Sequence, residues 1–256
     1  MSKNQSKHYD KISKKYQEHY FDNESKYYRS KIFIQRFKKY LDDGVEILDV
    51  GCGNGSYIEI LEENGIKGKN YCGLDTSIEN TKLFNDKFNF KYKVFHEDFT
   101  KKNLNLNKKF DSILLIGAVH HMYLDIEIVF ENLFNHLNEN GKIVIVEPNG
   151  SFLNFLRNYW YKKDKYFDET SERALKLSEI DTVAEKKFRK IFCEYQGFIG
   201  YFVILQSMIF RTPKIIKKKT YKFLTYIDEI MSKFNSKYLS SSYIIIYKKK
   251  SNSSKS

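Results

Sequence analysis

Between residues 45 and 149, short apolar runs alternate with segments whose apolar positions recur at helical spacing. Residues 45–50 (VEILDV) form an apolar run of strand length, and residues 55–64 place Ile58 and Leu61 on one side of a predicted helix that Gly65 ends. Further strands are predicted at 69–75, 91–98, 110–119 and 142–148, and further helices after Ser77 and over 125–138, where the turn NENG ends the helix. Strand–helix alternation of this kind is typical of an α/β, doubly wound, mostly parallel sheet.

The pattern after residue 150 is less regular. Residues 151–160 and 171–190 have helical character, and 198–205 and 241–250 are predicted as strands, which would bring the sheet to seven. Residues 213–235 have the spacing of an amphipathic helix. We expect its apolar side to face inward, with the residues Ile216, Phe223, Ile227, Ile230 and Phe234.

These elements predict one main domain over residues 41–250, with a cofactor half at 41–149 and a substrate cover at 150–250. A helical lid segment at 1–40 precedes it, and a polar, disordered tail at 251–256 follows it.

The stretch ILDVGCGNG (47–55) joins the first predicted strand to its helix. Ligands bind at such a position because it lies beyond the carboxyl ends of the strands, where glycine allows close backbone approach and the helix offers unpaired N–H groups. The spacing is GxGxG. It is neither the GxGxxG of dinucleotide folds nor the GxxxxGK[ST] of nucleoside triphosphate sites, so both ligand classes are disfavoured.

Two acidic residues end the next two predicted strands. Asp75 follows Gly55 by 20 residues, where a carboxylate accepts hydrogen bonds from ribose hydroxyls or, alternatively, caps a helix. Asp98 is placed to accept from an adenine amino group with Phe99 covering the ring, and its alternative is a solvated loop acid.

The segments ILDVGCGNG, GLDTS, HEDF, FDSILLIGAVHHM and LNENGKIVIVEPN, in this order, resemble the class I S-adenosylmethionine-dependent methyltransferases over residues 45–149. The resemblance implies a Rossmann-like methyltransferase fold with S-adenosylmethionine as cofactor. The implied cofactor-binding residues are Asp49, Gly51, Cys52, Gly53, Gly55, Asp75, Thr76, Asp98, Phe99, Ile116 and Gly117. The N-terminal YDKISKKY resembles the lid of the small-molecule branch, in which residues like Tyr9 and Tyr16 close over the cofactor.

His120 and His121 follow the central predicted strand, beside the expected methyl group. An imidazole titrates near pH ~6.5 and accepts a proton from a phenol, hydroxyl or ring nitrogen. We expect one of the two, preferably His120, to act as a general base while the other packs. No set of His, Asp or Glu with metal-ligand spacing surrounds them, so no metal is predicted.

Glu147 ends the fifth predicted strand, where it either binds substrate or fixes the turn before Pro148. Family members with EPN at this place mostly act on small molecules, lipids or glycans. The aromatic and charged segment 150–181 occupies the place of a substrate cover, and its candidate contacts are Arg157, Trp160, Tyr161 and Arg173.

The formal net charge of +12 is concentrated at both ends of the chain. Residues 1–40 carry 11 basic and four acidic side chains, residues 211–256 carry 12 and two, and the segment between them is mildly acidic. The lysines of 213–235 would suit an anionic membrane surface, although they also fit a packed helix with solvated lysines: Lys214, Lys217, Lys218, Lys219 and Lys222.

The cellular compartment is predicted from cysteines and hydropathy. Cys52, Cys72 and Cys193 form no CxxC pair, and no apolar stretch reaches the roughly 18 residues of a membrane span. We expect a cytoplasmic protein, with the option of peripheral contact at the inner membrane face.

The leading functional prediction is methyl transfer to an O, N or C atom of a small molecule, a lipid-linked intermediate or a sugar. The alternative is a tRNA methyltransferase of the wobble-uridine type, because DVGCGNG with a later AVHHM resembles those enzymes and basic ends suit phosphates. A non-catalytic relative of the fold is a third reading, disfavoured by the intact glycines and acids. Oligomeric state and acceptor atom are not predicted.

Overall fold

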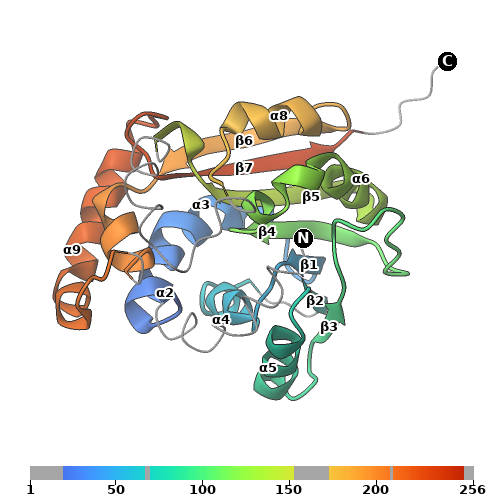
Figure 1. Cartoon of the computed structure of the whole chain (residues 1–256), viewed down its shortest axis with the longest axis horizontal. Coiled ribbons are helices and arrows are strands. Elements are labelled where there is room, and N and C mark those ends of the chain that lie inside the picture. The colour runs from blue at the N-terminus through green and yellow to red at the C-terminus, as the bar shows by residue number, and fades with distance from the viewer. Residues whose placement is uncertain (1–19, 67–69, 153–172, 208–209, 251–256) are drawn as a thin grey trace.

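Seven strands form a single sheet in the order β3-β2-β1-β4-β5-β7-β6. The computed structural model describes residues 20–66, 70–152, 173–207 and 210–250 (Figure 1). The strands are β1 Glu46–Val50, β2 Asn70–Asp75, β3 Lys93–His96, β4 Phe110–Ile116, β5 Leu137–Pro148, β6 Phe188–Gln196 and β7 Ser242–Lys249. The first five pair in parallel, and β7 runs antiparallel between β5 and β6, so the doubly wound, mostly parallel sheet is confirmed.

Helices cover both faces of this sheet. On one face, α6 Ile126–His136 and α8 Leu177–Ala184 pack on Leu48, Ile113 and Tyr247. On the other face lie α4 Ser56–Glu63, α5 Ile78–Phe88 and the N-terminal α2 Asn23–Arg29, η1 Ser30–Ile34, α3 Gln35–Phe37 and η2 Lys38–Tyr40. Sheet residues alternate between the two cores, as Tyr243 and Ile244 do, because neighbouring side chains on a strand point to opposite faces. The turns that follow the parallel strands therefore lie at the edge of a sheet with a hydrophobic core on each face.

Three predicted elements are wrong. Residues 198–205 were expected as a strand, but Tyr201–Leu205 form a π-helical turn (η6) whose buried side chains explain the apolar run. The last strand of the sheet instead begins at Phe188, inside the predicted helix 171–190, of which the structure has only α8. The turn expected at NENG is a bulge in β5, because Leu137 pairs with Phe110 and Lys142 already with Ser112.

The helix α9 Lys214–Ser232 lies with its polar side inward, opposite to the expectation. Its buried residues are Lys217, Thr225, Asp228 and Ser232. By contrast, Ile216 is 47%, Phe223 65% and Phe234 67% exposed, and Ile227 is half-buried. The prediction that the apolar side faces the core is therefore wrong.

Buried polar contacts fix this orientation of α9. Asp228 accepts hydrogen bonds from the backbone N–H groups of Phe198 at 2.8 Å, Gly200 at 3.0 Å and Tyr201 at 3.1 Å, and from the Tyr28 hydroxyl at 2.6 Å. One turn from the N-terminus of the helix, Lys217 forms a buried ion pair with Asp22 at 2.7 Å. A buried N–H or carboxylate without a partner is costly, so these contacts outweigh the burial of the apolar side.

Replacement of Asp228 by Ala tests this account of α9. The substitution leaves the three backbone N–H groups and the Tyr28 hydroxyl without their acceptor, and we expect the free energy of unfolding to fall by about 2–4 kcal/mol. Glu229→Ala is the matched control, since this neighbouring acid makes no such contacts, and its effect should stay within about 0.5 kcal/mol. Equal losses in urea unfolding of the two variants would contradict the assignment.

Candidate active site

The turn after β1 has the geometry of a ligand cradle. Gly51, Gly53 and Gly55 all adopt positive φ, at 77°, 55° and 75°. A Cβ on Gly55 would lie 2.5 Å from the ring of Phe88, so this glycine is required for packing. A Cβ on Gly53 would meet nothing within 4 Å, which leaves its backbone facing open space at the edge of the sheet.

The carboxylate of Asp75 holds this turn against the start of α5. Its Oδ2 accepts from the Gly53 N–H at 2.8 Å, and its Oδ1 accepts from the Ser77 N–H at 2.9 Å. Ser77 in turn caps α5 by accepting from the Asn80 N–H. Asp75 is 8% exposed, and Ser77, not Asp75, caps α5. The carboxylate thus has a structural role in the turn, and its ribose role stays a prediction.

Asp49 and Cys52 have their side chains beneath the turn, not on its surface. Asp49 is 2% exposed and accepts a hydrogen bond from the Tyr71 hydroxyl at 2.7 Å. Burial raises the pKa of Asp49 to about 7, although the Tyr71 hydrogen bond opposes this rise. Cys52 packs over Gly73, where a Cβ would lie 2.6 Å from its Sγ, and burial raises the pKa of its thiol. Both side chains thus support the turn from inside.

The end of β3 places Asp98 and Phe99 differently. Asp98 is half-buried and its Oδ1 accepts from the N–H of Thr100 at 2.9 Å and from its hydroxyl at 2.7 Å. Phe99 is 1% exposed and packs in the core 6.2 Å from the ring of His136, so its predicted role as a cover for adenine is not supported. Thr76 is half-buried, and its carbonyl lies 3.1 Å from Nε2 of His96.

The chain leaves the sheet after β4 through Ile116 and Gly117. Gly117 has φ 67°, is exposed, and would carry a Cβ with nothing within 4 Å. Its N–H donates to the carbonyl of Val146 at 2.8 Å, which keeps the turn against β5. A short 3-10 helix, Val119–His121, follows directly and carries both histidines.

Glu147 joins this 3-10 helix to the end of β5. Its Oε1 accepts from the Val119 N–H at 2.7 Å, and its Oε2 lies 2.6 Å from Nδ1 of His120. The carboxylate side chain is fully buried, whereas the His120 side chain is 14% exposed. His121 stacks on His120 with ring centroids 3.9 Å apart. A carboxylate oxygen only accepts, so Nδ1 of His120 donates to Glu147, and the neutral form of this ring has its lone pair on Nε2. Of the two roles left open for Glu147, fixing the turn is the one that the contacts show.

Sequence reasoning missed Arg29 in α2. Its guanidinium is 8% exposed, donates to the Tyr20 carbonyl at 3.3 Å and to the Tyr57 hydroxyl, and lies 4.7 Å from the ring of Phe21. Within the described ranges no carboxylate pairs with it. A buried cation of this kind favours an anionic ligand group. The signal was present only as one basic residue among many in a lysine-rich segment, so the sequence alone did not distinguish it.

Several predicted contacts lie outside the described residues: Tyr9, Tyr16, Arg157, Trp160 and Tyr161. Arg173 is described and is engaged elsewhere, because its guanidinium pairs with Glu179 at 2.5 Å and lies 4.8 Å from the ring of Tyr123. No group of three or more His, Cys, Asp or Glu able to hold a metal occurs in the part of the chain that the structure describes.

Comparison with known proteins identifies the family. A family model described as a methyltransferase domain matches residues 16–192. The chain belongs to this methyltransferase family. An uncharacterized protein of Methanocaldococcus jannaschii is 34% identical over 238 residues, covering 75% of this chain and 88% of that protein. A tRNA U34 carboxymethyltransferase of Nautilia profundicola is 30% identical over 154 residues, 56% of this chain and 49% of that protein.

Solved structures agree on the fold of the methyltransferase. A methyltransferase from Thermotoga maritima superposes with a TM-score of 0.61 at 14% identity, covering 95% of this chain and 99% of that one. Another from Clostridium acetobutylicum gives a TM-score of 0.59 at 17% identity, covering 94% and 98%. These likenesses show the Rossmann-like methyltransferase fold, which confirms the predicted class.

S-adenosylmethionine, the methyl donor of this family, fits the residues present. The open backbone at Gly53 and Gly117 provides room beside the chain, and the carboxylate of Asp75, the last residue of β2, accepts from the Gly53 N–H. The buried Arg29 would supply a positive charge for the donor's carboxylate. The polar and charged groups of these residues therefore match the polar and charged groups of the cofactor.

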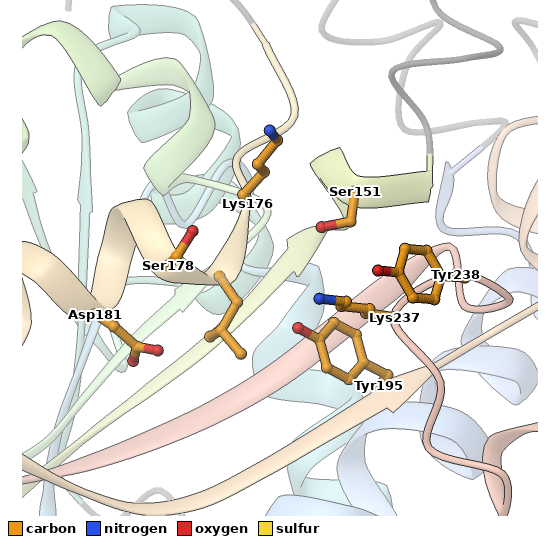
Figure 2. A pocket seen from close by; sticks show the side chains of 8 residues that line it. Ser151, Lys176, Ser178, Asp181, Tyr195, Lys237 and Tyr238 are labelled. Carbon is orange, nitrogen blue, oxygen red and sulfur yellow. The ribbon is translucent and has the colours of Figure 1, made fainter.

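A pocket of about 390 Å³ opens farther along the same edge of the sheet (Figure 2). Ser151 follows β5, Tyr195 lies near the end of β6, and Lys237 and Tyr238 precede β7. The start of α8 closes the pocket with Lys176 and Ser178. Figure 2 shows the Ser151 and Ser178 hydroxyls, the Tyr195 and Tyr238 phenols and two ammonium groups around the space.

Replacement of Asp75 by Ala tests the ribose assignment. We expect the affinity for S-adenosylmethionine to fall at least tenfold, about 1.4 kcal/mol, because hydrogen bonds to the cofactor and to the Gly53 N–H are both lost. Asp86→Ala, an exposed acid on α5, is the control and should bind as the wild type does. Unchanged affinity of Asp75→Ala in calorimetry would remove the assignment.

The raised pKa of Asp49 predicts a pH-dependent stability. An unfolded Asp ionises near pH ~3.9, whereas the folded carboxyl does so near 7, so between these values the folded chain keeps a proton that the unfolded chain releases. The contribution of protonated Asp49 to the free energy of unfolding is fully present below the unfolded pKa. It is lost as the pH rises to about 7, at roughly 1.4 kcal/mol per pH unit.

Urea unfolding from pH 4 to 8 should show this slope in the wild type and in the surface control Asp43→Asn. Asp49→Asn should show the slope reduced by the contribution of one carboxyl. The same slope in all three proteins would mean that Asp49 ionises normally.

Proposed function

We propose that the protein transfers the methyl group of S-adenosylmethionine to an oxygen or nitrogen atom of a small organic acceptor that must lose a proton, with His120 as the general base. The pairing of His120 with Glu147 is the observation that carries this proposal. S-adenosylmethionine supplies an activated methyl group on a positively charged sulfur, so its leaving group needs no acid.

The chain's own residues would have two tasks. The first is to hold the acceptor in line with the methyl group and to exclude water, which can supply up to about 7–11 kcal/mol of the barrier reduction. The second is to remove the acceptor's proton at Nε2 of His120, while Glu147 fixes the ring by holding Nδ1–H and stabilises the imidazolium that forms. Positive charge on His120 would then sit beside a buried carboxylate.

The pocket at β5 and β6 supports a small acceptor. Its volume of about 390 Å³ falls within the range of small-molecule sites, roughly 300–1,000 Å³. The pocket is lined by two lysines, Lys176 and Lys237, and by one acid, Asp181, which already pairs with Lys190. The lysines favour an acceptor with a carboxylate or phosphate remote from the methylated atom. Ser151 lies four residues after Glu147, just beyond the end of β5. The pocket and the base therefore lie at the same edge of the sheet.

A tRNA methyltransferase is the second candidate. The likeness to the tRNA U34 carboxymethyltransferase supports it, but that likeness spans about half of each chain. The basic residues of both chain ends would contact phosphates. Total extract incubated with the protein and labelled S-adenosylmethionine separates the candidates: label in small polar or lipid fractions supports our proposal, and label in RNA overturns it in favour of the second.

The variant His120→Gln tests the role of the base once an accepting fraction is found. We expect kcat to fall by about 10²–10⁴-fold in His120→Gln, because general base catalysis contributes that much, while S-adenosylmethionine binding is unchanged. The acidic limb of the wild-type rate profile, which reports protonation of the base, should disappear. A rate and a pH profile like those of the wild type in His120→Gln would exclude it as the base.

A further inference from the structure

The outward side of α9 carries an apolar stripe that the described protein leaves uncovered. The stripe consists of Ile216, Phe223, Tyr226, Ile230 and Phe234, and their exposed fractions run from 36% to 67%. With Lys219 between the first two, the first four positions recur every three or four residues and so lie along one side of the helix, and Phe234 follows two residues after the helix ends. Figure 1 shows α9 at an outer edge of the molecule. Soluble proteins seldom expose a contiguous apolar surface of this kind without a use.

Basic side chains surround the stripe. Between residues 211 and 240, all exposed charged side chains are positive: Arg211, Lys214, Lys218, Lys219, Lys222, Lys233 and Lys237. The two acids of this segment, Asp228 and Glu229, are buried and half-buried. The surface therefore combines large apolar groups with an unbalanced positive charge.

The orientation that exposes the stripe is fixed by the polar contacts on the opposite side of α9. Asp228 is held by three backbone N–H groups and Tyr28, and Lys217 is held by Asp22, Ser25 and Ser207. Rotation of the helix to bury the stripe would break all of these buried contacts at once. The stripe is thus a fixed feature of the fold that residues 20–66, 70–152, 173–207 and 210–250 leave uncovered.

We propose that this α9 stripe docks the protein on an anionic membrane surface. An amphipathic helix with aromatic and aliphatic groups on one side and lysines beside them lies in the plane of the lipid interface, with each lysine attracted to anionic headgroups. Ile216 and Phe223 would enter the acyl boundary, and the long lysine stems would reach the headgroup phosphates.

The charge pattern favours lipid over the other occupants. A second copy of the chain on a two-fold axis would set two lysine-rich surfaces against each other, which is unfavourable. A nucleic acid would use the lysines and aromatic rings, but it would leave the aliphatic groups Ile216 and Ile230 without a complementary surface. Membrane lipid matches both halves of the surface.

Docking in this orientation would place one wall of the pocket near the lipid. Residues that follow α9 continue the exposed surface, with Tyr238 68% and Leu239 42% exposed, and Lys237 and Tyr238 also line the pocket. An acceptor that resides in the membrane would then reach the pocket without crossing water. The docking itself does not depend on the acceptor and is tested separately from the proposed function.

Vesicle flotation of the full chain tests the proposal. One set of vesicles contains phosphatidylcholine alone and the other adds phosphatidylglycerol. We expect binding to the anionic set to exceed binding to the neutral set at least about tenfold, and to weaken as salt is added. The double variant Phe223→Ser/Phe234→Ser should lose about tenfold or more of this binding, because its apolar anchors are gone.

The matched control is Phe90→Ser/Leu124→Ser, which removes two side chains that are 74% and 72% exposed away from α9. This control should bind vesicles as the wild type does, and thermal melting should show that both double variants remain folded. Lack of binding to anionic vesicles, or equal binding by the α9 variant, overturns the proposal. Two other outcomes overturn it when the protein binds no vesicles. A tRNA gel shift that the α9 variant loses and the control keeps favours RNA as the occupant. A dimer in sedimentation with the same dependence favours a second copy.

Discussion

The candidate active site depends on one buried carboxylate, that of Glu147. Its two oxygens accept from the Val119 N–H at 2.7 Å and contact Nδ1 of His120 at 2.6 Å, so the end of β5 holds the turn that leaves β4. The residue is 1% exposed, so water replaces neither contact readily and the arrangement is costly to break. The position, tautomer and proton-accepting nitrogen of His120 all follow from this pairing.

Two further carboxylates, those of Asp75 and Asp228, hold chain segments together in the same way. Asp75 joins the glycine turn to the start of α5, and Asp228 joins the start of η6 to α9. In each case a buried carboxylate accepts hydrogen bonds from backbone N–H groups in a turn or in the first residues of a helix. Loops at the edge of a parallel sheet have few apolar contacts of their own, and these carboxylates supply the order that a binding site needs.

The order of the first five strands, the glycine turn and the acids at strand ends could be predicted because their signals are local: apolar runs, glycine spacing and strand-to-helix alternation. The orientation of α9 could not, since its pattern of Ile216, Phe223 and Phe234 is that of an ordinary packed helix. What reverses it is a set of partners distant in sequence, from Asp22 and Tyr28 to residues 198–201. Likewise, β6 could not be predicted because its charged residues, such as Arg189 and Lys190, continue the helical pattern of the residues before it. The burial of Phe99 and of Arg29 results from tertiary packing, which residue spacing does not reveal.

The tautomer of His120 is the sharpest measure of its contact with Glu147, because it can be read without knowing the acceptor. Long-range proton–nitrogen NMR of the ¹⁵N-labelled protein at neutral pH distinguishes the two neutral forms of each histidine, and His120→Gln identifies the signal. The account predicts that His120 carries its proton on Nδ1 and that Glu147→Gln weakens this preference. A wild-type His120 protonated on Nε2, with the same pattern in Glu147→Gln, would contradict it.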